Sequence, residues 1–368
     1  MDMLNKEAFL ALVRAGLWEQ EAKLLPLGAI DFLQVLTLAE EQSAVGLVAA
    51  GIEQVKDIRV QTEHVLQFVG QALQLEQRNV AMNQFIGHII ETMREAGIYT
   101  VLIKGQGVAQ CYVKPQWRTS GDVDLFLDEN NYQKALAYLT PLATSVGEVD
   151  KDRLHVGMTI ESWLVELHGT MHTEISKRID VSIDAIQKDI FENNGVRIWK
   201  NGNTDIFLPS VDNDVFIIFT HFIDHFFVGG VGIRQICDWC RFLWTYRSEI
   251  NADLLTCRLE EMGLFSEWKA FAAFAVDYLG MPEEAMPLYS TSPQYRRKAR
   301  KILDLVFYTG NFGQNKDESY RSRYPHIVQI IITFCRRLAE FVRLTTIFPK
   351  DAPKFFLTYV TRRVKDSF

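Results

Sequence analysis

The hydrophobic pattern changes twice along the chain, and these two changes constrain the fold more than any other feature. From residue 1 to about 97, apolar residues recur at steps of three and four with few Gly or Pro, which is typical of helices. From 98 to 210 the apolar runs are short and rich in β-branched residues, and from 211 to 368 the helical spacing returns. We therefore predict an α+β protein with a small mixed β-sheet core between two helical regions.

Within this outline, a long helix from about Gln61 to Glu95 is predicted to end at Gly97, which suits a left-handed C-terminal cap. Asp128 is a candidate N-cap for a helix that continues to about Leu139. The apolar and β-branched runs predict strands at 99–103, 122–127, 155–160, 162–168, 196–199 and 204–208.

Composition excludes several classes of protein. The net charge is −7, so the whole chain lacks the basic field of a non-specific nucleic-acid binder. Lys and Arg gather after about Tyr295, which leaves nucleic acid open as a partner, although solvated helix faces explain this bias more simply.

The five cysteines are too scattered for a disulfide framework, and Cys237 and Cys240 lack the second pair that a zinc site needs. Without a secretory signal or an apolar run of about 18 residues, a cytoplasmic protein with no membrane partner is expected.

The tripeptide Asp-x-Asp occurs three times, at 122–124, 150–152 and 212–214. The second lies in a charged stretch that is typical of a turn, and the third begins a predicted helix, where acidic residues are favoured. The first differs because Asp122 and Asp124 begin an otherwise apolar strand. Strand alternation places these two carboxylates on one face, about 7 Å apart along the backbone.

Two adjacent carboxylates repel each other, and a fold tolerates them best when cations neutralise them. Mg²⁺, or Mn²⁺ in its place, prefers oxygen ligands and is commonly held by one or two carboxylates together with substrate phosphates. Glu166 lies in the later apolar segment WLVELH and is the candidate third ligand beside Asp122 and Asp124. The simpler alternative is that Glu166 faces solvent on an edge strand.

Lys104 and Gly105 lie where a predicted strand gives way to a helix. Glycine permits close backbone approach there, helix N–H groups attract anions, and the lysine can neutralise phosphate charge. Arg118, Ser120 and Gly121 precede the acidic strand and are further candidates for contacts with phosphate oxygens. An ordinary strand-to-helix turn and a polar loop are the alternatives.

These residues carry a resemblance to known proteins. The order strand, Lys-Gly, helix, Asp-x-Asp strand and a later strand with a third acid resembles the nucleotidyltransferase superfamily typified by DNA polymerase β and kanamycin nucleotidyltransferase. More narrowly, LIKGQGVAQCYVKPQWRTSGDVDLFL and then VELH are similar to the bacterial family of uncharacterised nucleotidyltransferases, over about 70 residues. Its members share a Lys-Gly, an Arg-x-x-x-Asp-x-Asp and a Glu-x-His. The resemblance implies that residues 98–210 form the nucleotidyltransferase core.

The resemblance also implies the roles of the acids. Asp122 and Asp124 would ligate two metal ions, and Glu166 would be a third ligand that helps an acceptor hydroxyl lose its proton. The chain departs from the superfamily at Gln106, where Gly-Ser or Gly-Gly is usual, and in the long gap before Asp122. This departure weakens the implied triphosphate contacts more than the metal ligands.

The C-terminal helical region also resembles the family, through HFIDH and GIRQICD. His221 and His225 lie one helical turn apart and, with His168, are candidates for a substrate cleft. Arg234 and Asp238 are spaced in the same way, which predicts a structural ion pair between them.

The predicted function is transfer of a nucleoside monophosphate from a nucleoside triphosphate such as ATP to a hydroxyl-bearing acceptor, with release of pyrophosphate. The acceptor would attack the α-phosphate in line, between two metal ions about 3.5 to 4 Å apart. Two alternatives stay open. A metal-dependent glycosyltransferase would use an Asp-x-Asp without needing Glu166, and a nucleotide-binding or structural adaptor would keep the acids without turnover. The sequence does not identify the acceptor or the preferred base.

Overall fold

The computed structural model describes residues 3–313, 315, 323 and 325–366. A five-stranded mixed sheet has the order β1-β2-β5-β4-β3, and a separate antiparallel pair is formed by β6 and β7. The strands are β1 Val101–Ile103, β2 Asp122–Phe126, β3 Ala143–Val146, β4 His155–Ile160, β5 Trp163–His168, β6 Val196–Asn201 and β7 Thr204–Pro209. The first helices are α1 Met3–Trp18, α2 Phe32–Glu41, α3 Val45–Ile52 and α4 Thr62–Glu95, and within the core lie α5 Gly105–Ala109, α6 Glu129–Leu139 and α7 Lys177–Glu192. The later helices are α8 Val211–Val228, α9 Ile233–Thr245, α10 Ala252–Met262, α11 Phe265–Leu279, α12 Pro293–Thr309, α14 His326–Ile347 and α15 Ala352–Asp366.

This architecture confirms the predicted α+β class. β2 and β5 run parallel, whereas β1 with β2, β4 with β5 and β3 with β4 are antiparallel, so the sheet is mixed. The long helix α4 is confirmed, Gly97 after it adopts a positive φ of 69°, and the Asp128 side chain caps α6 by accepting from the Asn131 N–H.

Two elements were not predicted. Strand β3 has the sequence ATSV and lies mostly exposed at the edge of the sheet, so it lacks the apolar run that marks a buried strand. Helix α7 is amphipathic and buries isoleucines at three- and four-residue steps, a signal that the sequence did contain: Ile179, Ile183, Ile186 and Ile190.

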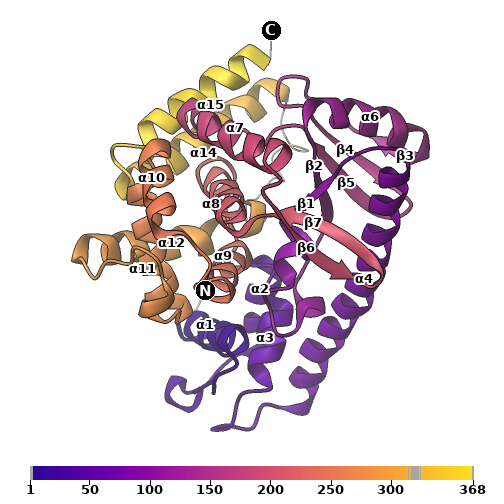
Figure 1. The fold of residues 1–368 in the computed structure, drawn as a ribbon. Helices are drawn as coiled ribbons and strands as arrows, with labels where there is room; N and C mark the ends of the chain where they lie inside the picture. The colour runs from indigo at the N-terminus through magenta and orange to yellow at the C-terminus, as the bar shows by residue number, and fades with distance from the viewer. Residues whose placement is uncertain (1–2, 314, 316–322, 324, 367–368) are drawn as a thin grey trace.

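The two faces of the sheet have different roles. One face carries Val123 and Leu125 of β2 with Val165 and Leu167 of β5, and it packs in one hydrophobic core with α4 and α6. Because successive side chains of a strand alternate, the acids of β2 and β5 lie on the other face. That face looks toward α8 and α9, and Figure 1 shows the strands between α4 on one side and these two helices on the other.

The N-terminal and C-terminal helices pack together although they are far apart in the sequence. Helices α1 and α3 share a hydrophobic core with α8, α9, α11 and α12. The Trp18 indole N–H donates to the carbonyl of Leu279, and the Gln42 side chain donates to Val306 and accepts from the Ile233 N–H. The Gln42 contacts fix the end of α2 against α9 and α12. Within the described residues, no helix is long and apolar enough to cross a membrane.

Candidate active site

Three carboxylates meet on the open face of the sheet. Asp124 of β2 lies directly beside Glu166 of β5 in the parallel register, and Asp122 precedes it by two residues on the same face. One carboxylate oxygen from each of the three lies within 4.8 Å of those of the other two. β5 lies between β2 and β4, so Glu166 is on an inner strand and the edge-strand alternative is wrong. The three acids that the sequence groups together therefore do lie together in the structure.

Charge within this cluster is only partly balanced. Repulsion by Asp124, followed by burial, raises the pKa of Asp122. Burial would also raise the pKa of Asp124, but the charge of Lys104 and a hydrogen bond from His168 outweigh burial and lower it. Hydrogen bonds from His155 and then His168 lower the pKa of Glu166. Asp124 and Glu166 are therefore held as carboxylates, while Asp122 carries the unrelieved repulsion.

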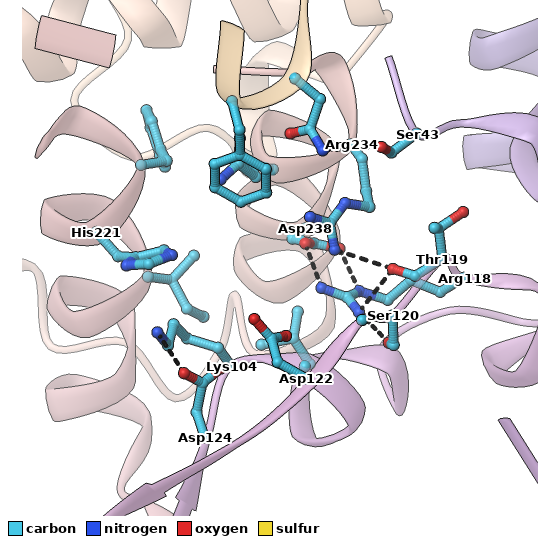
Figure 2. Close-up of a pocket in the computed structure, with 18 of the residues that line it drawn as sticks. Ser43, Lys104, Arg118, Thr119, Ser120, Asp122, Asp124, His221, Arg234 and Asp238 are labelled. Atoms are coloured by element: carbon cyan, nitrogen blue, oxygen red, sulfur yellow. Dashed lines mark hydrogen bonds and ion pairs between the residues drawn. The ribbon is translucent and has the colours of Figure 1, made fainter. Parts of the chain in front are cut away.

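Lys104 forms an ion pair with one acid of the cluster. Its Nζ lies 2.9 Å from Oδ1 of Asp124, and its side chain is 11% exposed. The residue has φ 54°, uncommon for a residue with a side chain, and Gly105 after it has φ 37°. This bend lets the chain turn from β1 into the short helix α5 and aims the lysine at Asp124, as Figure 2 shows.

Arg118, rather than Arg234, forms the ion pair with Asp238. Arg118 donates from Nε and Nη2 to the two oxygens of Asp238, both at 2.7 Å, and from Nη1 to Ser120 Oγ at 2.6 Å. Arg234 instead donates from Nη1 to the carbonyl of Thr119 at 2.9 Å. The predicted Arg234–Asp238 pair is therefore wrong, because docking of α9 brings Asp238 against Arg118 rather than leaving it to its neighbour on the helix.

The carboxylates lie on the floor of a cavity of about 470 Å³, within the usual size range of small-molecule sites. The cavity is lined by Lys104, Gly105, Arg118, Ser120 and Gly121, all predicted to contact phosphate, and by Asp122, Asp124 and Glu166. Arg234 looks onto the same space from α9, above the carboxylates in Figure 2. Arg78 of α4 also lines the cavity, and the sequence analysis did not single it out.

A second cavity, of about 310 Å³, shares Lys104 and Glu166 with the first. All three predicted cleft histidines, His168, His221 and His225, line it, and the latter two line both cavities. His168 Nε2 lies 2.8 Å from Asp124 Oδ1. Burial would lower the pKa of His168, but its hydrogen bonds to Asp124 and Glu166 outweigh burial and raise it.

The sequence analysis missed His155, whose Nε2 lies 3.3 Å from Glu166 Oε2. It faces His168 across the β4–β5 register, with ring centroids 4.8 Å apart. His155 lies at the start of a β-branched run, and nothing in the local sequence indicates that it would contact Glu166. His221 and His225 contact each other with ring centroids 4.5 Å apart, and burial lowers the pKa of both, that of His225 to about 4. They are therefore neutral groups at neutral pH.

The remaining candidates have structural roles. The carboxylate of Asp150 accepts backbone N–H groups in a turn and pairs with Arg153 at 2.7 Å, and Asp214 pairs with Arg197 at 2.7 Å. Cys237 and Cys240 are fully buried free thiols, and burial raises the pKa of both.

Fold and site together define an α+β protein with a carboxylate cluster on the floor of a cavity lined by cations. A known family, described as uncharacterised nucleotidyltransferase, matches residues 28–280. The match covers well over half of the chain and includes the sheet, α8 and α9. The chain belongs to this family of nucleotidyltransferases. No curated protein and no solved structure matches it significantly.

Proposed function

We propose that the protein is a metal-dependent nucleotidyltransferase of the type typified by DNA polymerase β. It would move a nucleoside monophosphate from a nucleoside triphosphate to a hydroxyl-bearing acceptor and release pyrophosphate. The observation that carries this proposal is the convergence of Asp122, Asp124 and Glu166 within 4.8 Å of one another beside a cation-lined cavity. The family membership supports nucleotidyl transfer in general.

The donor set fits Mg²⁺ or Mn²⁺. All three residues offer carboxylate oxygens, the ligands that these hard cations prefer. Lys104 and His168 are too few to balance three carboxylates, and the raised pKa of Asp122 reflects that deficit. When bound, the ions would neutralise charge on the phosphates and on the oxygens that enter and leave at phosphorus.

The protein's own residues would bind and orient the triphosphate in the first cavity. Lys104 lies beside Asp124 and faces that cavity. Its Nζ can leave the carboxylate of Asp124 and bind a phosphate oxygen instead. Gly105, Ser120 and Gly121 line the same wall and present a small hydroxyl and backbone close to the floor. Arg118 is held by Asp238, so it would fix the loop that carries Ser120. Its positive charge would also favour binding of the triphosphate.

The acceptor would enter through the second cavity, because in-line displacement needs the attacking and leaving oxygens on opposite sides of the phosphorus. Lys104 and Glu166 line both cavities, so the two spaces meet at the carboxylate cluster. The acceptor oxygen would bond to the α-phosphorus as the bond to the bridging oxygen of pyrophosphate breaks. Glu166, oriented by His155 and His168, would receive the proton of the acceptor hydroxyl.

Calorimetric titration with ATP, GTP, CTP and UTP, in Mg²⁺ and in EDTA, tests this proposal. We expect Mg²⁺-dependent binding of at least one nucleotide to the wild type and its loss in Asp124→Asn. Asp152→Asn is the matched control, because Asp152 belongs to another Asp-x-Asp and is exposed in a turn. Equal binding in Mg²⁺ and in EDTA would contradict the proposal.

Pyrophosphate release separates the proposal from its rivals. A transferase that binds a nucleotide in this way should release pyrophosphate when supplied with an acceptor or, slowly, with water. An adaptor should bind the nucleotide and release none. A glycosyltransferase would tolerate Glu166→Gln, whereas the position of Glu166 in the cluster predicts loss of turnover in that variant.

A further inference from the structure

The helical wall of the first cavity carries polar atoms that the chemistry at the carboxylates does not use. Arg234 and Gln235 begin α9, and Asn311 and Phe312 lie in the turn after α12. All four residues line the cavity that also contains Asp122. We call these four residues the α9 corner.

Each of three side chains in the α9 corner has one buried polar atom without a hydrogen-bond partner among the described residues. The atoms are Arg234 Nε, Gln235 Nε2 and Asn311 Oδ1. Other atoms of the same side chains are used: Arg234 Nη1 donates to Thr119, Gln235 Oε1 accepts from the Gly232 N–H, and Asn311 Nδ2 donates to Ser43 Oγ. Leaving such atoms unpaired costs free energy. The wall therefore carries two donors and one acceptor whose hydrogen bonds the described residues do not supply.

Phe312 presents an aromatic ring beside these atoms. It is 48% exposed, and one contact, with His225, holds it edge-on at a centroid distance of 4.8 Å. Its φ of 51° lies in the left-handed region, which a bulky side chain rarely adopts. Strain of this kind persists where the surroundings impose it and often marks a ligand-binding turn.

The packing of this turn is itself specified by the sequence. A Cβ atom on Gly232 would lie only 2.8 Å from Cβ of Asn311, so this glycine is what allows the turn to dock on the start of α9. The hydrogen bond from Asn311 to Ser43 holds the turn from the opposite side. The α9 corner is thus assembled by three distant stretches of chain around one end of the cavity.

We propose that the α9 corner binds the base of the nucleoside triphosphate, an inference that rests on the proposed function. Phe312 would stack on the base, since every base has a π-face, and Gln235 and Asn311 would meet donors and acceptors on its edge. Arg234 would contact a phosphate oxygen between the base and the carboxylates. Among the described residues no carboxylate lies within ion-pair distance of Arg234, and Figure 2 shows it across the cavity from Asp122.

Titration with each of the four nucleotides and with inorganic tripolyphosphate, all with Mg²⁺, tests this assignment. Phe312→Asn removes the ring and introduces a residue that adopts positive φ more readily, so the turn should still fold. We expect its nucleotide affinity to fall about tenfold or more and its tripolyphosphate affinity to be unchanged. Phe312→Tyr keeps the ring and should bind like the wild type.

Arg234→Gln should instead weaken both nucleotide and tripolyphosphate, because it removes a phosphate contact. Unchanged nucleotide affinity in Phe312→Asn, with Mg²⁺-dependent binding intact in the wild type, would overturn the assignment and leave the proposed function standing. A wild type that binds no nucleotide would overturn both. If Phe312→Asn raises only the KM for the acceptor, the α9 corner binds the acceptor and the assignment is wrong.

Discussion

In the sheet, three carboxylates lie within 4.8 Å of one another and share one lysine and two histidines. In helices α7, α8 and α9, each buried aspartate has an arginine of its own: Asp180 with Arg362, Asp214 with Arg197, and Asp238 with Arg118, at 2.6 to 2.7 Å. These three aspartates of the helices are each paired, whereas the sheet acids are under-compensated, since repulsion by Asp124 raises the pKa of Asp122. That contrast supports the proposal that cations from outside the chain neutralise the sheet acids.

The largest expected effect is on turnover. Asp122→Asn and Asp124→Asn should each lower the rate of pyrophosphate release by about a thousandfold or more, because each removes a proposed metal ligand and a charge near the proposed phosphate site. Asp152→Asn should keep the wild-type rate. Turnover is measured with the nucleotide that the wild type prefers. A normal rate in either cluster variant would show that the sheet acids, like the paired acids of the helices, are not needed for the reaction.

Breaking a paired acid in the helical region should instead cost stability. Asp238→Asn leaves Arg118 buried without its counter-charge, so we expect a loss of about 3–5 kcal/mol in the free energy of unfolding. Urea titration measures this quantity. The double variant Arg118→Met/Asp238→Leu should recover much of the loss, since an apolar pair replaces the ion pair. If Asp238→Asn were as stable as the wild type, the Arg118–Asp238 pair would not stabilise the fold, and the contrast with the sheet acids would be lost.

A buried acid of a third kind sharpens the contrast, because its raised pKa favours the protonated form. Glu267 of α11 is fully buried, and burial, with a smaller contribution from Asp351, raises its pKa to about 8. Stability should therefore fall as the pH rises from about 4.5, the unfolded pKa, to about 8. We expect Glu267→Gln to unfold with a free energy higher by roughly 1–3 kcal/mol at pH 8 and to flatten this dependence. Urea titrations at pH 5 and pH 8 measure it.

The smallest effect separates two members of the cluster in metal-free protein. Repulsion raises the pKa of Asp122 above its ordinary value of 3.8, so stability falls as the pH rises from 3.8, and the loss is complete above the raised pKa. Lys104 and His168 lower the pKa of Asp124, so its ionised form contributes stability that is lost as the pH falls through its folded pKa.

At pH 7 in EDTA, Asp122→Asn should therefore raise Tm, and Asp124→Asn should lower it, each by about 2–4 °C per kcal/mol. Both differences should vanish in strong acid, where both carboxylates are protonated in either state. A scan of melting temperature against pH measures both signs. Shifts of the same sign in the two variants would contradict the charge distribution within the cluster.

Prediction from sequence succeeded where the relevant physics is local. Alternation along β2 is enough to place Asp122 and Asp124 on one face, and a third acid within an apolar strand had few places to lie. It failed for Arg234, where spacing on one helix predicted a pair with Asp238 that the tertiary structure does not form. It also passed over His155, whose partner Glu166 lies across a strand pair that no local pattern specifies.

By itself, the sequence determined the α+β layout, the strand that presents the acids, and the glycine that permits close backbone approach at the turn after Lys104. Only the tertiary structure decided which cation meets which acid and which side chains form the far wall of the cavity. The reason is range: strand and helix periodicities act over a few residues, whereas Asn311 meets Ser43 across 268 positions and Arg118 meets Asp238 across 120. Such pairings depend on how the helices dock.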